Sequence, residues 1–157
     1  MSIRSKQGDE LTAQDVYDIW RIRDAVFAVE QQVDDEDPDG RDLLSTTSHL
    51  WVADDDGPTS YLRVIVDDKG ERRIGRVCTR RDQRGQGLSG QLMAEVHRQW
   101  GDQTLRLNAQ AYLERWYESF GYTRCGENFD DAGIDHVPMI REPGGGAGRP
   151  RAADSTA

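Results

Sequence analysis

The spacing of apolar positions changes along the chain, and each spacing predicts one kind of element. Short apolar runs that are bounded by turn residues predict strands. We expect these strands at residues 49–53, 60–66, 73–79, 104–111, 122–125 and 135–140. Turns rich in aspartate, glycine and proline separate the first three strands, which is typical of hairpins. The first part of the sheet is therefore predicted to be antiparallel.

Apolar residues three or four positions apart predict helices before and between the strands. The first helix can be capped by Thr12 to Asp15, and its expected core-facing residues are Val16, Ile19, Trp20 and Phe27. A second helix is expected up to Trp100, and a short third one over 113–120, closed by Gly121. Antiparallel strands followed by a β-α-β-α-β order predict an α/β fold. We expect a single-domain three-layer α/β/α sandwich with a mixed, mostly antiparallel sheet.

Length and composition limit the domain count and the partners. A chain of 157 residues can form one domain with a real core, which we place at residues 1–142. Residues 143–157 are rich in glycine, proline and alanine and are predicted to be a disordered tail. The net charge of −9 argues against general nucleic-acid binding. No apolar run approaches the ~18 residues of a membrane span, so we expect a cytoplasmic protein without a membrane partner.

Two features that could bind a metal ion fall short of a metal site. Cys78 and Cys125 form neither a disulfide framework nor a metal motif, and both lie in strand-like runs, so buried free thiols are predicted. The acidic stretch Asp35–Gly40 matches the first half of an EF-hand loop, but Thr46 stands where the bidentate glutamate belongs. We interpret this stretch as a solvated acidic loop, or as one that attracts a cationic amine. No metal is expected.

The most informative segment is the glycine-rich stretch Arg84–Gly90, with the sequence RGQGLSG. It follows a predicted strand and opens the second helix. Glycines let the backbone approach a ligand, and a helix N-terminus adds partial positive charge, so this junction can hold a phosphate. Three arginines, Arg80, Arg81 and Arg84, stand at its entrance in an otherwise acidic chain. The segment therefore predicts a phosphorylated ligand.

Two alternatives exist for this segment. Gly85, Gly87 and Gly90 also spell the dinucleotide fingerprint, which requires a carboxylate near the end of the next strand. That strand offers Asn108 and Gln110 instead, and the chain is short for a Rossmann domain. A polar surface loop without a ligand is the other alternative.

Four motifs resemble the GNAT acetyltransferases, and in particular their ElaA-like subgroup. Arg84–Ser89 is similar to the Arg/Gln-x-x-Gly-x-Gly/Ala signature that binds the pyrophosphate of coenzyme A, with Ser89 in place of the last small residue. Residues 111–122 resemble the family's helix with its Tyr-x-x-x-Gly-Phe/Tyr ending. Arg23–Gln31 resembles the subgroup's Arg-x-x-Val-Phe-x-x-Glu-Gln helix end. Positions that also fall where the subgroup has similar residues are His49, Gln110, Ala111 and 133–136.

The resemblance implies a coenzyme A site and an acid catalyst. The residues expected to contact the cofactor are Val77, Cys78, Thr79, Arg84, Gly85, Gln86, Gly87, Leu88, Ser89 and Gly90. The strand residues among them would run beside the pantetheine arm and offer a backbone N–H to the acetyl oxygen. Tyr117 occupies the family's tyrosine position and is expected to give a proton to the leaving thiolate. Its alternative role is core packing.

A second group must take the proton of the acceptor amine. Glu30 ends the first helix after an apolar run and is the first candidate; an exposed helix-end glutamate is the alternative. His49 and His136 are weaker candidates, because a lone histidine more often makes structural hydrogen bonds. Cys78 has no paired base in the sequence and is not expected to carry an acyl group.

The resemblance therefore implies an N-acetyltransferase that moves an acetyl group from acetyl-CoA, its cosubstrate, to a primary amine by direct transfer in a ternary complex. One alternative is a non-catalytic sensor that binds acyl-CoA. Another is a different acyltransferase of the same fold, like a homoserine-lactone synthase. The expected acceptor is a small-molecule or peptide amine, and a homodimer is compatible with the sequence.

Overall fold

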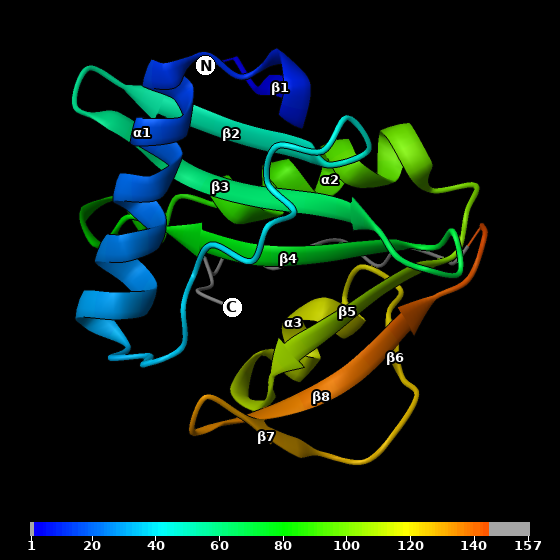
Figure 1. Ribbon diagram of the computed structural model, residues 1–157. Helices are drawn as coiled ribbons and strands as arrows, with labels where there is room; N and C mark the ends of the chain where they lie inside the picture. The colour runs from blue at the N-terminus through cyan, green and yellow to red at the C-terminus, as the bar shows by residue number, and fades with distance from the viewer. Residues whose placement is uncertain (1, 145–157) are drawn as a thin grey trace.

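The computed structural model describes residues 2–144 of the chain (Figure 1). Within them one eight-stranded sheet runs in the order β1-β2-β3-β4-β5-β8-β6, and β7 pairs with β8. The strands are β1 (Arg4–Gln7), β2 (Ser48–Asp54), β3 (Gly57–Val66), β4 (Arg72–Thr79), β5 (Leu105–Gln110), β6 (Thr123–Arg124), β7 (Phe129–Asp131) and β8 (Ile134–Arg141). Only β4 and β5 pair in parallel among these strands, so the predicted mixed, mostly antiparallel sheet is confirmed.

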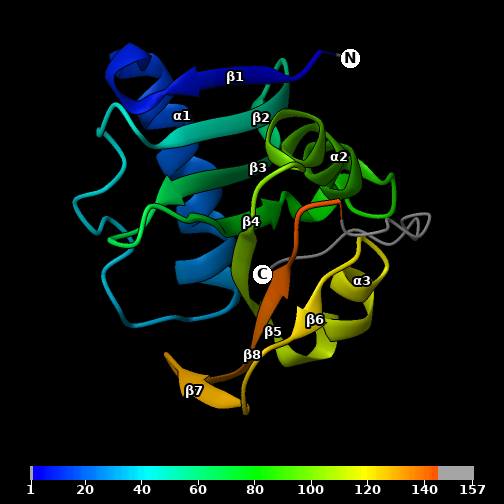
Figure 2. The same cartoon turned by 90° about the vertical axis from the view of Figure 1, so that its right-hand side faces the viewer.

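Helices cover both faces of the sheet, as the predicted three-layer sandwich requires (Figure 2). α1 (Ala13–Arg23) begins after Thr12, whose hydroxyl accepts a hydrogen bond from the Asp15 backbone N–H at 3.1 Å. It continues directly into a π-helix, Asp24–Glu30. α2 (Leu88–Trp100) and the short α3 (Glu114–Glu118) pack on the opposite face.

Alternating residues of β2 and β3 divide the core into two parts. Leu50 and Leu62 pack with α2 and α3, whereas Trp51 and Tyr61 pack with α1. Successive side chains of a strand point to opposite faces, so each of these strands contributes to both layers. All four residues are at most 1% exposed.

The sheet opens between β4 and β5. The two strands pair only where Arg72–Ile74 lie beside Leu105–Leu107, and beyond that point they diverge toward their C-terminal ends (Figure 1). β4 is also irregular: its pairing with β3 shifts register between Tyr61 and Arg63, and Arg76 has a φ of +53°. This is a β-bulge, which bends a strand locally. The bulge and the divergence leave a gap in the sheet beside the end of β4.

Two predictions about the core are wrong. Val16 and Trp20 are 39% and 55% exposed, because α1 packs on the sheet through Ile19 and Ile22 instead. α1 carries apolar residues on more than one side, so spacing alone did not identify its buried face. Cys125 is exposed rather than buried, because it follows the two-residue strand β6 and lies beyond the sheet.

Two short strands were not predicted, and one prediction falls mostly outside the described residues. β1 reads RSKQ and β7 reads FDD, and both are short edge strands held by backbone hydrogen bonds rather than by an apolar pattern. Of the tail predicted at 143–157, only residues 143 and 144 are described, so its disorder stays a prediction. Of the helices in residues 2–144, none combines the length and the apolarity needed to cross a membrane.

Candidate functional site

The glycine-rich segment forms the junction between β4 and α2. Gly85 and Gly87 have φ values of +82° and +74°, which residues other than glycine rarely adopt. No atom of the described chain lies within 4 Å of a Cβ added to either glycine, so open space faces both backbones. α2 begins at Leu88, and the first N–H groups of a helix have no helical carbonyl to bind. The junction therefore has the geometry of an anion-binding loop.

The three arginines at this junction differ in their partners. Arg80 is neutralised by Asp54 and Asp82, each at 2.6 Å. Both terminal nitrogens of Arg84 donate hydrogen bonds to the Glu30 carboxylate at 2.6 Å. Arg81 is exposed and forms no ion pair with a described residue. The cations within reach of an anionic ligand are therefore Arg81 and, when Glu30 is displaced, Arg84.

The end of β4 supplies the side chains behind the loop. The Thr79 hydroxyl lies 2.6 Å from the Ser89 hydroxyl and 2.9 Å from that of Ser60, so buried hydroxyls connect β4 to the first turn of α2. Cys78 is fully buried, and burial raises the pKa of its thiol. A thiol that stays protonated is a poor nucleophile. All the residues predicted to contact a cofactor thus surround one junction, and the contacts themselves stay predictions.

Glu30 lies at this loop and not in the adjoining pocket. The hydrogen bonds from Arg84 are the main cause of the lowered pKa of Glu30. The residues that line the pocket include its neighbours Ala28 and Gln31, but not Glu30. In this structure the Glu30 carboxylate therefore faces Arg84 of the glycine loop. Its role as a general base stays a prediction.

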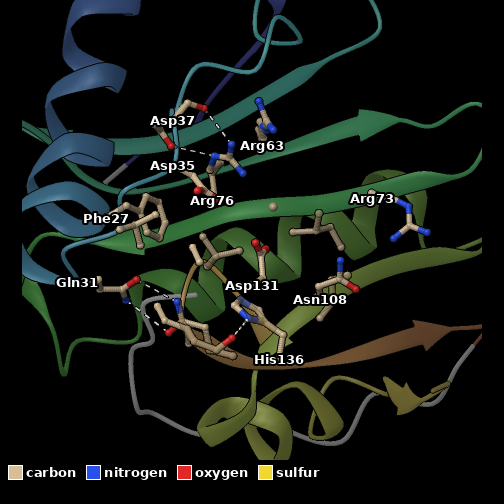
Figure 3. Close-up of a pocket in the computed structure, with 18 of the residues that line it drawn as sticks. Phe27, Gln31, Asp35, Asp37, Arg63, Arg73, Arg76, Asn108, Asp131 and His136 are labelled. Carbon is tan, nitrogen blue, oxygen red and sulfur yellow. Dashed lines mark hydrogen bonds and ion pairs between the residues drawn. The ribbon is translucent and has the colours of Figure 1, made fainter. Parts of the chain in front are cut away.

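A pocket of about 350 Å³ opens where β4 and β5 diverge (Figure 3). The π-helix and the acidic loop, residues 34–42, form one wall. β4 and β5 form the back, and the β7–β8 hairpin forms the opposite wall. Val77, two residues before the end of β4, lines this pocket and lies next to the strand end from which the glycine loop departs. The loop and the pocket therefore meet at the end of one strand.

Buried arginines hold the acidic loop against the sheet. Arg23 and Arg63 are only 3% and 4% exposed. Arg23 donates to the carboxylates of Asp37 and Asp42 at 2.7 Å, and Arg63 donates to those of Asp39 and Asp42 at 2.9 Å. The bond from Arg63 lowers the pKa of Asp39, and for Asp42 the bonds from both arginines outweigh the opposing effect of burial. The prediction of a solvated loop is therefore wrong for Asp37 and Asp42, which are partly buried, whereas Asp39 is ion-paired but exposed.

The pocket-lining charges that have no ion-pair partner among the described residues are negative. Asp35 and Glu36 of the acidic loop and Asp131 of β7 line the pocket and form no ion pair with a described residue. Each arginine that lines the pocket is bonded to an aspartate. Within residues 2–144, no group of three or more histidines, cysteines, aspartates or glutamates is placed to hold a metal ion. The carboxylates without an ion-pair partner therefore give this pocket a negative charge.

Tyr117 belongs to the core and to the pocket at the same time. Its ring is 1% exposed and packs edge-on against Trp116 and Tyr122, with centroids 4.8 Å and 6.1 Å away. The residue also lines the pocket from α3. The two roles that the sequence left as alternatives are thus compatible. Proton donation by Tyr117 stays a prediction.

Two of the three histidines have structural surroundings outside the pocket. His49 is fully buried: its Nε2 donates to a backbone carbonyl of the acidic loop at 2.8 Å, and its Nδ1 accepts from the Tyr61 hydroxyl at 2.7 Å. Burial lowers its pKa. His97 bonds to the Tyr122 hydroxyl at 2.9 Å, and burial lowers its pKa to about 4. Neither residue lines the pocket.

His136 on β8 does line the pocket and is 9% exposed. Its Nδ1 lies 2.7 Å from the Ile134 carbonyl oxygen, and its ring stacks on Phe129 at a centroid distance of 5.7 Å. The neighbouring strand β5 places Gln110 directly opposite it. Figure 3 shows His136 and Asp131 directed into the space between β4 and β8.

Sequence reasoning missed the contacts that give the pocket its shape. Gln110 donates to the Gln31 side chain at 3.0 Å and so joins β5 to the end of the π-helix (Figure 3). These residues are 79 positions apart, and their sequence gives no signal of the contact. The ion pairs did leave a signal. Arg63 and Arg76 stand inside predicted strands, where a charged side chain usually needs a partner.

Comparisons with known proteins agree on one family. A family model described as an acetyltransferase (GNAT) domain matches residues 9–143. A UPF0039 protein of Mycobacterium tuberculosis is 41% identical over 153 residues, which cover 95% of this chain and 98% of the relative. Protein ElaA of Escherichia coli is 34% identical over 139 residues, which cover 85% of this chain and 91% of the relative.

Two solved structures share the fold. An acyl-CoA N-acyltransferase from Pseudomonas aeruginosa superposes with a TM-score of 0.82 at 32% identity, and the match covers 90% of this chain and 99% of the other. The structure of Escherichia coli ElaA gives the same TM-score and the same coverage at 31% identity. Both matches extend over nearly all of the described chain.

Proposed function

This chain belongs to the GNAT acetyltransferase family, and from that premise we propose that it moves an acetyl group from acetyl-CoA to a primary amine by direct transfer. The observation that carries the proposal is the meeting of an anion-binding loop and a pocket at the end of β4. A ligand with phosphates at the loop could extend along β4 and present its other end in the pocket. Acetyl-CoA has this shape, with a pyrophosphate and a thioester at opposite ends of its pantetheine arm.

The backbone and the cations of the glycine loop support the proposal that the pyrophosphate of acetyl-CoA binds there. The two glycines with positive φ and the start of α2 offer N–H groups, and Arg81 adds an exposed positive charge. The two oxygens of the Glu30 carboxylate accept two hydrogen bonds from the Arg84 guanidinium. A phosphate can offer a guanidinium two oxygens in the same way. We propose that the pyrophosphate replaces Glu30 as the partner of Arg84.

The negative charge of the pocket supports the proposal that the acceptor amine binds there. A primary amine reaches the protein mainly as a cation at neutral pH, and three unpaired carboxylates face the pocket. During transfer, the amine nitrogen bonds to the thioester carbon and the bond from that carbon to sulfur breaks. In this proposal the Tyr117 hydroxyl gives its proton to the departing sulfur, and a backbone N–H at the end of β4 stabilises the oxyanion.

The test is a screen of amines for release of free thiol from acetyl-CoA. We expect cationic amines to give release above the rate of hydrolysis, and mass spectrometry to find the acetyl group on the amine. A Gly87→Leu variant, whose side chain would occupy the open space at the loop, should lose coenzyme A binding in calorimetry while its circular dichroism is unchanged. A protein that binds coenzyme A and acetylates no amine would be a sensor instead.

A further inference from the structure

We propose that His136 takes the proton of the acceptor amine. This inference rests on the proposed acetyl transfer. It assigns the role of general base to His136, on the β8 wall of the pocket, instead of to Glu30 beside the glycine loop. Three independent features carry it: the face on which His136 lies, the hydrogen bond that fixes its tautomer, and the engagement of the competing bases elsewhere.

The β7–β8 hairpin places His136 on the pocket side. Phe129 pairs with His136 and Asp131 with Ile134, so strand alternation puts all four residues on one face. Of these, Asp131, Ile134 and His136 line the pocket. Phe129 stacks on the imidazole at an interplanar angle of 24°, and Gln110 lies opposite it on β5. The ring is therefore positioned by the Phe129 stack and by the hydrogen bond of its Nδ1 to Ile134.

The hydrogen bond to Ile134 determines which ring nitrogen can act as a base. The Ile134 carbonyl oxygen, 2.7 Å from Nδ1, can only accept a hydrogen bond. Nδ1 must therefore carry a proton, and the lone pair of neutral His136 is on Nε2. No described residue forms a hydrogen bond with Nε2. Nε2 is thus an acceptor atom without a hydrogen-bond partner among the described residues, on a side chain that lines the pocket and is 9% exposed.

The other candidates are engaged or lie elsewhere. The Glu30 carboxylate is bonded to Arg84 at the loop. In His49 both ring nitrogens are bonded, and His97 is on the other face of the sheet beside Tyr122. Histidine is also the side chain whose ordinary pKa lies nearest to neutrality, which is where a general base is most effective.

Charged groups from several elements surround the pocket that His136 lines. The carboxylates that face it are Asp131 on β7 and Asp35, Glu36 and Asp37 on the acidic loop. The cations are Arg63 on β3 and Arg73 and Arg76 on β4, each bonded to an aspartate, and Tyr117 on α3 is the other titratable group. In the proposed step His136 takes one proton from the ammonium and becomes an imidazolium, and the neutral amine attacks the thioester. As the carbon–sulfur bond breaks, Tyr117 gives its proton to the sulfur, and the second proton that the nitrogen must lose passes to the Tyr117 phenolate, so the product amide is uncharged.

The test variant is His136→Asn. The Asn amide N–H can replace Nδ1–H at the Ile134 carbonyl, so the local hydrogen bond survives while the basic nitrogen is lost. With butylamine as the acceptor probe, kcat/KM should fall about 10²-fold, and its pH profile should shift to higher pH, where the amine deprotonates without help. With O-benzylhydroxylamine, which is already neutral at pH 7, the loss should be several times smaller. Circular dichroism and thermal unfolding report whether the variant folds.

Glu30→Gln provides the matched comparison. It should change the KM for acetyl-CoA, because it alters the partner of Arg84, and keep the wild-type pH profile for butylamine. If instead Glu30→Gln shifts the pH profile and folded His136→Asn does not, the inference about His136 is overturned while the proposed function stands. A wild-type protein that acetylates no amine overturns the proposed function as well.

A second readout does not depend on turnover. Diethyl pyrocarbonate reacts with an accessible, unprotonated histidine nitrogen, so peptide mapping should find His136 modified faster than His49, which is fully buried and has both ring nitrogens bonded. Acetyl-CoA should slow this reaction if its thioester lies beside Nε2. Equal reactivity of His136 and His49 would contradict the free Nε2 on which the proposal depends.

Discussion

The glycine loop and the pocket use their arginines in opposite ways. At the loop, Arg81 has no ion-pair partner among the described residues, and Arg84 is held by a single exposed pair with Glu30. In the pocket, Arg63, Arg73 and Arg76 are each bonded to an aspartate. Buried Arg23 adds two further bonds to the acidic loop, one to Asp37 and one to Asp42. The loop therefore offers positive charge to a ligand, while the pocket offers negative charge.

This difference shows that arginine content alone does not identify an anion site. The deciding property is whether each guanidinium already has a carboxylate partner of its own. An exposed ion pair contributes about 0.2–1 kcal/mol and exchanges readily, whereas removing one member of a buried pair costs about 3–5 kcal/mol. By this criterion Arg84 is available to a ligand, whereas Arg23 and Arg63 hold the acidic loop against the sheet.

The largest effect we expect comes from Tyr117→Phe, which tests whether the pocket is where the chemistry occurs. The substitution removes one oxygen and keeps the ring that packs between Trp116 and Tyr122. If Tyr117 is the acid, turnover should fall by about 10²–10⁴-fold while the affinity for acetyl-CoA is unchanged. Tyr122→Phe is the matched control, because it loses a buried hydroxyl outside the pocket. Normal turnover in Tyr117→Phe would leave this residue a core role only.

The next effect concerns the replaceable pair at the loop. Arg84→Ala should weaken coenzyme A binding by about 1.5–3 kcal/mol, because a charge-assisted bond to phosphate is lost. Arg80→Ala is the control: it removes an arginine from the same junction that Asp54 and Asp82 already neutralise. Calorimetry should show a smaller loss for Arg80→Ala. If both variants lose the same amount of coenzyme A affinity, Arg84 is no more available to the ligand than Arg80, which already has two aspartate partners.

A third prediction tests the buried pairs of the pocket wall. Asp42→Asn leaves two buried guanidiniums with weaker partners and should destabilise the protein by about 1–3 kcal/mol in urea unfolding. The folded-state pKa of Asp42 is lowered, so its contribution is present above the ordinary value of 3.8 and is lost as the pH falls through the lowered value. Acidification should therefore destabilise Asp42→Asn less than the wild type. Asp34→Asn, an exposed neighbour, should stay within about 0.5 kcal/mol of the wild type.

The smallest effect should come from Arg81→Ala. An exposed cation near the loop should contribute about 0.2–1 kcal/mol to coenzyme A binding. Because this interaction is screened by salt, the difference from the wild type should disappear at about 1 M salt. A larger loss that survives high salt would mean that Arg81 makes a direct, desolvated contact and not a distant electrostatic one.

Local patterns in the sequence predicted the loop well, because its geometry depends on adjacent residues. The positive φ values of Gly85 and Gly87 and the start of α2 follow from residues within one turn of each other. The strands with apolar runs and the capping of α1 by Thr12 and Asp15 were predicted for the same reason. These features need no knowledge of what packs against them.

The pocket could not be predicted in this way, because its contacts join distant parts of the chain. Arg23 reaches Asp42 across 19 positions, and Arg63 reaches Asp39 across 24. The acidic loop therefore looked solvated from its composition, and the buried face of α1 was misidentified. His136 was only a weaker candidate base in the sequence for a related reason. The role proposed for it depends on a tautomer and a strand register that the sequence does not display.

In the acidic loop, the residues that hold the loop in place are different from the residues that only line the pocket. Asp37, Asp39 and Asp42 are its anchors, whereas Asp35 and Glu36 face the pocket without supporting the scaffold. If the pocket takes the acceptor amine as proposed, substitutions at positions 35 and 36 can change which amine is used without releasing the loop from the sheet. Asp35 and Glu36 are therefore the first two residues to vary when the aim is a different acceptor.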